Sequence, residues 1–100
     1  MNNKEYFGSL INHIVQGDSI EVMKKIPDNS IDVTFADPPF NLKKKYNSYH
    51  DKHEVDDYLS WCKQWLHEIV RITKPTGAIF VHNIPKWLIY FGSYLREKYI

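Results

Sequence analysis

Cysteine, glycine and unbroken apolar stretches are scarce in this chain of 100 residues. The single cysteine, Cys62, excludes an internal disulfide, and it falls on the apolar stripe of a predicted helix, so we expect a buried, reduced thiol rather than a nucleophile. No stretch approaches the roughly 20 apolar residues that span a bilayer, and residues 1–5 do not lead into a secretory apolar segment. The sequence therefore predicts a cytoplasmic protein with no membrane partner.

A clear excess of charge of one sign is also missing. The chain has 13 Lys and Arg against 12 Asp and Glu, a net charge of +1, whereas a DNA-binding domain usually carries a basic excess. His50 and His53 have no cysteine or further histidine at zinc-ligand spacing, so we predict no metal site. With 43% hydrophobic and 15% aromatic residues, the chain can bury one small core, which makes a single domain the upper limit.

The most informative feature that is present is the tetrapeptide Asp37-Pro38-Pro39-Phe40, which directly follows the apolar run 31–36. A residue before proline is restricted to extended backbone, and proline offers no N–H. The Asp37 side chain and the Pro38 carbonyl are therefore expected to be rigidly held acceptors at the end of a strand, with the flat ring of Phe40 beside them.

Two acceptors and a ring suit a planar substrate that carries an exocyclic amine, and a nucleobase fits this description. Such an amine is a poor nucleophile because its lone pair is delocalised into the ring. Acceptors for its protons favour a tetrahedral nitrogen and so localise the lone pair. Because the amine becomes acidic only after it has gained a methyl group and a positive charge, we expect Asp37 to orient and stabilise the amine and to accept its proton late.

Together with its flanking segments, the tetrapeptide resembles the amino-group DNA methyltransferases, which use S-adenosylmethionine to modify adenine N6 or cytosine N4. The resemblance covers nearly the whole chain and rests on Val15–Asp18, Ile26–Asp32, Ala36–Asn41 and Lys74–Gly77. The order of these segments is similar to the opening third of the permuted class, in which the catalytic motif precedes the cofactor motif. For the tetrapeptide alone, an ordinary strand-to-loop turn is the alternative interpretation.

The resemblance implies a Rossmann-like α/β fold, mainly a parallel sheet with flanking helices, of which residues 1–100 form an incomplete N-terminal catalytic part. It implies that Asp37, Pro38 and Phe40 are catalytic, that Asp18 and Asp37 contact the cofactor, and that S-adenosylmethionine is the methyl donor. It implies double-stranded DNA as the substrate, and it is compatible with a homodimer and with a restriction endonuclease in the same system. Asp in the first position of the tetrapeptide favours adenine N6, with cytosine N4 as the alternative.

One part of the family pattern is missing, namely the cofactor loop in which an aromatic residue precedes Gly-x-Gly. The four glycines, Gly8, Gly17, Gly77 and Gly92, all stand apart. In the permuted class this loop lies near the C-terminus, so we expect the chain to be part of a longer enzyme and to be inactive alone. Two other classes stay open: a non-catalytic nucleic-acid-binding module that depends on lysines 43–45 rather than on Asp37, and an inactive structural fragment.

The segment 41–53 combines basic and aromatic residues directly after the tetrapeptide. We predict DNA contacts from Asn41, Lys43, Lys44 and Lys45, and we expect a loop that is flexible without DNA. The other residues of this character are Tyr46, Tyr49, His50, Lys52 and His53, against Asp51 alone. A solvated surface loop without specific contacts is an equally good interpretation.

The predicted order of elements alternates strands with helices, which is typical of a parallel sheet covered by helices. The expected elements are a strand at Ile14–Val15, a helix at Ser19–Lys25, a strand at Ile31–Ala36, a helix from Asp51 to Thr73, a turn at Pro75–Gly77, a strand at Ala78–Val81 buried on both faces, and a last helix with Trp87, Phe91 and Leu95 toward the core.

Asp18 has two compatible roles. It is expected to cap the helix that begins at Ser19, which stabilises a helix by about 1 kcal/mol, and the resemblance implies that its carboxylate faces the adenine of the cofactor. Asp18, Asp37 and Asn83 each follow a predicted strand, so we expect them at one edge of the sheet. Asn83 is expected there as a turn former or as part of the base pocket.

Overall fold

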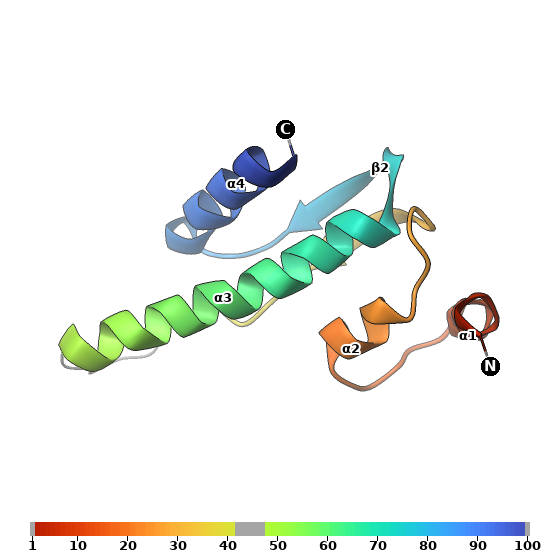
Figure 1. Cartoon of the computed structure of the whole chain (residues 1–100), viewed down its shortest axis with the longest axis horizontal. Helices are drawn as coiled ribbons and strands as arrows, with labels where there is room; N and C mark the ends of the chain where they lie inside the picture. The colour runs from red at the N-terminus through yellow and green to blue at the C-terminus, as the bar shows by residue number, and fades with distance from the viewer. Residues whose placement is uncertain (1, 42–47, 100) are drawn as a thin grey trace.

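The computed structural model describes residues 2–41 and 48–99, with side chains described at 2–41 and 54–99. Within these ranges the elements are α1 (Asn3–Leu10), α2 (Ser19–Lys24), β1 (Ile31–Ala36), α3 (Ser48–Ile72), β2 (Thr73–Val81) and α4 (Pro85–Tyr99) (Figure 1). The predicted combination of a parallel sheet with flanking helices is confirmed. No helix in this part of the chain is long and apolar enough to cross a membrane.

The sheet consists, over the described residues, of β1 and β2 paired in parallel, with α3 between them in the chain. Parallel neighbours require such a crossover because the chain has to return to the end where the first strand began. The register runs from Val33 opposite Ala78 to Ala36 opposite Val81, which confirms both predicted strands. The carboxyl ends of β1 and β2 therefore lie side by side at one edge of the sheet.

β2 begins earlier than predicted, because the segment that was expected to form a turn is built into the strand. Thr73 already pairs with Ile31, and the register is irregular between this pair and Val33–Ala78, which places Pro75–Gly77 in a bulge. A Cβ atom on Gly77 would lie 2.4 Å from the carbonyl oxygen of Asp32. The bulge therefore requires glycine at this position, since any side chain would collide with the facing backbone.

One face of the sheet packs against α3, the longest of the described helices, with α2 and α4 beside it (Figure 1). Cys62 and Leu66 of α3 are completely buried, and Ile79 and Val81 of β2 pack against the same cluster. The prediction that this helix lies on the sheet is confirmed. The buried cluster consists of Ile20, Tyr58, Cys62, Trp65, Leu66, Ile69, Trp87 and Phe91.

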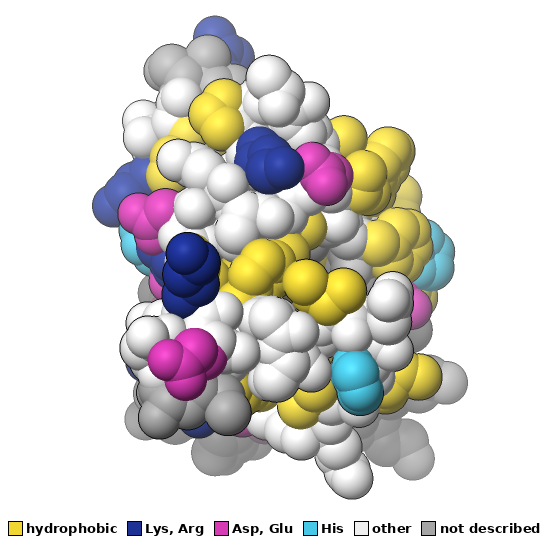
Figure 2. Space-filling model, turned by 90° about the vertical axis from the view of Figure 1, so that its right-hand side faces the viewer, with side chains coloured by type: hydrophobic (Ala, Val, Ile, Leu, Met, Phe, Trp, Pro, Cys, Tyr) yellow, Lys and Arg dark blue, Asp and Glu magenta, His cyan; other side chains and the backbone are white. Residues whose placement is uncertain are grey.

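The opposite face of the sheet is open, which contradicts the prediction of a strand buried on both faces. Phe80 of β2 is 55% exposed, and Val33 and Phe35 of β1 are 60% and 68% exposed. The apolar character of both faces of β2 led to the prediction, but no described element covers this side. Hydrophobic side chains also reach the surface on the side of the molecule that Figure 2 shows.

Three further boundaries differ from the predictions. Ile14–Val15 do not form a strand, since they lie in an irregular, exposed stretch with Ile14 fully solvated. Residues 3–10 form a helix that was not predicted, although Asn2 caps it by accepting from the Glu5 N–H at 2.8 Å, a spacing that the sequence also has at Asp18 and Glu21. The helix that follows Asp18 ends one residue before Lys25, which is its C-cap.

The structure describes the segment 41–53 only at residue 41 and, for the backbone, at residues 48–53. α3 begins at Ser48, three residues before the predicted start at Asp51, so the backbone of the last six residues of this segment is helical. Residues 42–47, which include Lys43, Lys44 and Lys45, lie outside the described residues. The flexibility of the segment therefore stays a prediction.

A single arginine joins α2 to α3. The Arg71 guanidinium donates to the carbonyl oxygens of Met23 and Ile26 at 2.6 and 2.9 Å, next to the C-terminal end of α2. It also pairs with the carboxylates of Glu68 at 3.0 Å and Asp28 at 2.6 Å. Because the last carbonyls of a helix have no partner within the helix, this fork of donors satisfies groups that would otherwise be left unpaired.

Candidate active site

The tetrapeptide Asp37–Phe40 directly follows β1, at the point where the pairing of the two strands ends. The last sheet-like hydrogen bond of β1 runs from the His82 N–H to the Ala36 carbonyl at 2.9 Å. Beyond this point Pro38 and Pro39 have no N–H to offer, so the ladder cannot continue. The sequence thus ends the strand and brings the Asp37 side chain to the carboxyl edge of the sheet, as predicted.

Two buried aromatic side chains hold the end of the tetrapeptide. The Tyr58 hydroxyl of α3 donates to the Pro39 carbonyl at 2.5 Å, and the Trp87 indole N–H of α4 donates to the Phe40 carbonyl at 2.6 Å. Their rings are in contact, with centroids 4.9 Å apart. Two consecutive carbonyls that leave the sheet are therefore held by donors from two different helices.

Asn83 completes this support from the end of β2. Its side-chain amide donates to the Tyr58 hydroxyl at 3.3 Å, while its carbonyl oxygen accepts from the Ile84 N–H at 2.8 Å. Asn83 is buried. It therefore orients the hydroxyl that holds Pro39, while its expected roles as a turn former and as part of the base pocket stay predictions.

Burial raises the pKa of two neighbouring side chains of α3, Tyr58 and Cys62. Desolvation raises the pKa of Tyr58 to about 12, against an opposing effect of the Asn83 hydrogen bond. Burial likewise raises the pKa of the Cys62 thiol to about 11. Tyr58 is thus a neutral donor, and the predicted burial of the Cys62 thiol is confirmed, since the side chain is completely enclosed.

The Asp37 carboxylate, in contrast, is exposed and has a single partner among the described residues. Its Oδ1 lies 3.0 Å from Nδ1 of His82, the residue that follows β2. The His82 ring in turn meets Phe40 edge to face, with centroids 5.3 Å apart and an interplanar angle of 68°. Asp37, Phe40 and His82 therefore form one cluster at the carboxyl edge of the sheet.

The Pro38 carbonyl differs from those of Pro39 and Phe40. In the described part of the chain no donor reaches it, whereas its two neighbours are occupied by Tyr58 and Trp87. The site therefore presents two available acceptors, one carboxylate oxygen of Asp37 and the Pro38 carbonyl, while His82 connects Asp37 to the ring of Phe40. The binding of an exocyclic amine by these acceptors stays a prediction.

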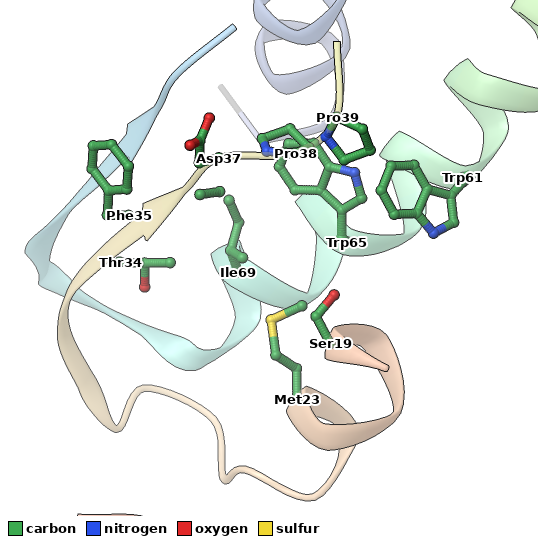
Figure 3. A pocket seen from close by; sticks show the side chains of 11 residues that line it. Ser19, Met23, Thr34, Phe35, Asp37, Pro38, Pro39, Trp61, Trp65 and Ile69 are labelled. Atoms are coloured by element: carbon green, nitrogen blue, oxygen red, sulfur yellow. The ribbon is translucent and has the colours of Figure 1, made fainter. Parts of the chain in front are cut away.

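Beside these acceptors lies a pocket of about 380 Å³ between α2, β1 and α3 (Figure 3). Its walls are flat and largely apolar, with Trp61, Trp65 and Ile69 from α3 and Met23 from α2, and with Pro38, Pro39 and Asp37 at the end of β1. The volume falls within the usual range for small-molecule sites, and such sites combine apolar walls with a few polar groups. A planar heteroaromatic ring fits this set of residues.

Asp18 caps α2 next to this pocket. Its Oδ1 accepts from the N–H groups of Ile20 at 2.9 Å and Glu21 at 3.3 Å, which confirms the predicted cap. Ser19, the first residue of α2, lines the pocket, whereas Asp18 does not. Asp18 also does not follow a strand as expected, since Ile14–Val15 are irregular.

The remaining predicted contacts have different outcomes. Asn41 has a left-handed backbone, with φ of 54°, so it turns the chain directly after Phe40. Its predicted contact with DNA stays a prediction, as do those of the three lysines outside the described residues. No group of three His, Cys, Asp or Glu side chains suited to a metal ion occurs over residues 2–41 and 54–99.

The sequence interpretation missed Tyr58, His82 and the tryptophan walls of the pocket. Tyr58 falls on the apolar face of α3 four residues before Cys62, a spacing that reads as core packing. His82 directly follows the Ala78–Val81 run, at the position where a polar side chain lies at the carboxyl edge of a parallel sheet. That placement was the only available signal for it.

Comparison with known proteins agrees with these features. A model of the DNA methylase family matches residues 31–95. The chain is 43% identical over 96 residues to the type II methyltransferase M.BamHI of Bacillus amyloliquefaciens, which covers 95% of this chain and 23% of that protein. It is 32% identical over 84 residues to the type II methyltransferase M.HpaI of Haemophilus parainfluenzae, with 84% of this chain and 27% of that protein covered.

A third relative is the DNA adenine methyltransferase YhdJ of Escherichia coli strain K12, 32% identical over 77 residues, with 77% of this chain and 26% of YhdJ covered. The chain therefore spans about a quarter of the length of these curated relatives. The family match extends from the first residue of β1 into α4 and includes the whole tetrapeptide. The chain belongs to the N6/N4 DNA methylase family.

Proposed function

We propose that this chain is the target-amine half of a DNA methyltransferase that transfers a methyl group from S-adenosylmethionine to the exocyclic amine of a base flipped out of double-stranded DNA. The observation that carries the proposal is the pair of available acceptors, the Asp37 carboxylate and the Pro38 carbonyl, beside the Phe40 ring. The preferred target is adenine N6. Asp in the first position of the tetrapeptide supports this choice, and one relative is named as an adenine methyltransferase.

The acceptors act on the two protons of the amine. A hydrogen bond from the amine to Asp37 and a second to the Pro38 carbonyl draw the nitrogen toward a tetrahedral geometry, which localises its lone pair opposite the two acceptors. Once the nitrogen has gained a methyl group and a positive charge, its proton passes to Asp37, which then releases it to solvent. The rigid backbone at the two prolines keeps both acceptors in place during this change.

The pocket between α2, β1 and α3 holds the heteroaromatic part of the cofactor in this proposal. S-adenosylmethionine supplies an electrophilic methyl group on a positively charged sulfur. Trp61 and Trp65 offer flat walls for the adenine ring, and the Asp37 carboxylate at the rim favours a nearby positive charge. Asp18 is the N-cap of the adjacent α2. Its carboxylate oxygen that does not cap the helix is proposed to approach the amine of the cofactor's adenine ring.

The proposal also covers the sheet, the DNA contacts and the partners of the complete enzyme. The two-stranded parallel sheet is proposed to be part of a larger Rossmann-like sheet, because the relatives are about four times as long. Lys43, Lys44 and Lys45 follow the site in the chain and are proposed, with Asn41, to contact DNA phosphates. A second copy of the enzyme and a restriction endonuclease of the same system are proposed as partners of the complete enzyme.

The test of the target base is direct. The complete enzyme is incubated with duplex DNA and S-adenosylmethionine that carries a labelled methyl group, and the DNA is digested to nucleosides for mass spectrometry. Label in N6-methyladenine supports the proposal. Label in N4-methylcytosine would support methylation of an exocyclic amine but make cytosine the target base. Unlabelled DNA would contradict both the amine chemistry and the choice of base.

We expect Phe40 to stack on the flipped base. A methyl donor has to approach in line with the amine lone pair, which a stacked duplex blocks. In the complete enzyme, 2-aminopurine at the target position should brighten on binding, and Phe40→Ala should give a brighter signal than the parent because an aromatic ring against the base quenches it. The same change should weaken binding by about 1–3 kcal/mol, the usual value for stacking of one base.

Phe40→Tyr serves as the control for the stacking prediction, because it keeps the ring and its contact with His82. It should behave like the parent in both measurements. Identical fluorescence for Phe40→Ala and the parent would show that the ring only fills the space between β1 and His82.

The 100-residue chain by itself is expected to transfer no methyl groups and to bind S-adenosylmethionine only weakly. The methionine end of that ligand needs close backbone approach at a glycine-rich turn, and the four glycines of the chain stand apart. The open sheet face with Val33, Phe35 and Phe80 should favour self-association. Calorimetric titration and sedimentation velocity measure the two properties, and micromolar single-site binding to a monomer would contradict the prediction.

A further inference from the structure

His82 touches three residues of the tetrapeptide region at once. Its backbone N–H donates to the Ala36 carbonyl, its Nδ1 lies 3.0 Å from the Asp37 carboxylate, and its ring meets the ring of Phe40. The side chain is nonetheless 62% exposed and belongs to no part of the buried cluster. A side chain with these contacts adds little to the core, but it touches Asp37 and Phe40, two of the three groups that the proposed function assigns to the target base.

The hydrogen-bond direction between His82 and Asp37 follows from the chemistry of the acid. An ionised carboxylate can only accept, so Nδ1 of His82 carries the hydrogen and donates it to Oδ1. Oδ1 is thereby occupied, while Oδ2 has no partner among the described residues. The carboxyl group would otherwise rotate freely about its last bond, because an exposed side chain has nothing else to hold it.

We propose that His82 is a positioning residue, which turns the Asp37 carboxylate so that Oδ2 faces the amine of the target base. The proposal rests on the proposed function. It assigns no proton transfer to the imidazole, because Asp37 itself is exposed and can release the amine proton to water.

The alternative role for His82 is structural, and its contacts separate the two. The bond that extends the sheet uses the backbone N–H, which every substitution except proline preserves. The side chain lies outside the buried cluster, so its replacement should leave the fold intact. An effect of side-chain replacement on turnover would therefore arise at the site.

Two substitutions in the complete enzyme test the proposal. His82→Asn keeps an N–H donor near the position of Nδ1 but removes the imidazole ring, whereas His82→Phe keeps a ring against Phe40 and removes the donor. A misplaced reacting group can cost about 100-fold in rate, so His82→Phe should lower kcat by about 10- to 100-fold. KM for DNA and for S-adenosylmethionine should change little, and His82→Asn should keep most of the activity.

Several results would overturn the assignment. Parent-like kcat in His82→Phe would show that the hydrogen bond does not matter, and equal losses in both variants would indicate acid–base chemistry of the imidazole. A lowered unfolding midpoint for both variants would indicate a structural role. Asp37→Ala is measured alongside: if it is inactive while His82→Phe is normal, only the role of His82 fails, whereas activity without Asp37 removes the proposed function together with this inference.

Discussion

Replacement of Asp37 by alanine in the complete enzyme is expected to abolish methyl transfer while binding of S-adenosylmethionine stays close to that of the parent. Asp37 acts on the amine that receives the methyl group, so the loss should fall on the chemical step. Removal of one preorganised group that stabilises a transition state costs about 10²–10³ in kcat, and here the acceptor of the departing proton is lost as well. Single-turnover kinetics and cofactor titration measure the two effects separately.

Asp37→Asn is the matched control for this prediction. It keeps the size of the side chain and one acceptor oxygen, but it loses the charge that stabilises the methylated, positively charged amine. We expect turnover well below the parent and above Asp37→Ala. Near-normal turnover in the alanine variant would remove Asp37 from the mechanism, and a parallel loss of cofactor binding would show that its main role lies on the cofactor side.

Local chemistry explains why the core of this site was predictable from the sequence. The end of β1 is determined by two prolines that cannot donate to a ladder, and the start of α2 is determined by the Asp18 side chain, which accepts from N–H groups two and three residues later. Both features depend on residues within a few positions of one another. Their placement at the edge of a parallel sheet then follows from the alternation of strands and helices.

The supporting contacts were not predictable, because they join distant parts of the chain. Tyr58 and Pro39 lie 19 positions apart, Asp37 and His82 lie 45 apart, and Phe40 and Trp87 lie 47 apart. Periodicity assigned Trp87 correctly to the core, where it is 1% exposed. It carries no information on which acceptor a buried N–H will meet, since that depends on how helices pack on the sheet.

Apolar runs misled the prediction wherever a strand needs a partner or a cover. Ile14–Val15 have strand-forming side chains, yet in the described structure no neighbouring strand pairs with them. Phe80 lies in an apolar run typical of a doubly covered strand, yet it is 55% exposed. A sequence pattern indicates that a surface is suited to burial, whereas the burial itself depends on what packs there.

Substitution of Arg71 by alanine is expected to lower the free energy of unfolding by about 3 kcal/mol. Loss of one partner leaves the other buried charge uncompensated, and the carboxylate of Glu68 is only 10% exposed. The carbonyls of Met23 and Ile26 lose their donors as well, which loosens α2 on α3. Because Ser19 and Met23 of α2 line the pocket, cofactor binding should weaken together with stability.

Two control substitutions test whether the geometry and the burial of Arg71, and not only its positive charge, stabilise the fold. Arg71→Lys keeps the charge, but an ammonium group lacks the planar fork that reaches both Met23 and Glu68, so an intermediate loss is expected. Lys74→Ala breaks an ion pair with Asp32 whose side chains are 42% and 82% exposed, and exposed pairs contribute about 0–1 kcal/mol. Urea unfolding of the three variants measures the differences. If Arg71→Ala lowers the free energy of unfolding no more than Lys74→Ala does, then apolar contacts such as that of the buried Ile20 hold α2 on α3. Arg71 would then not be the residue that fixes this wall of the pocket.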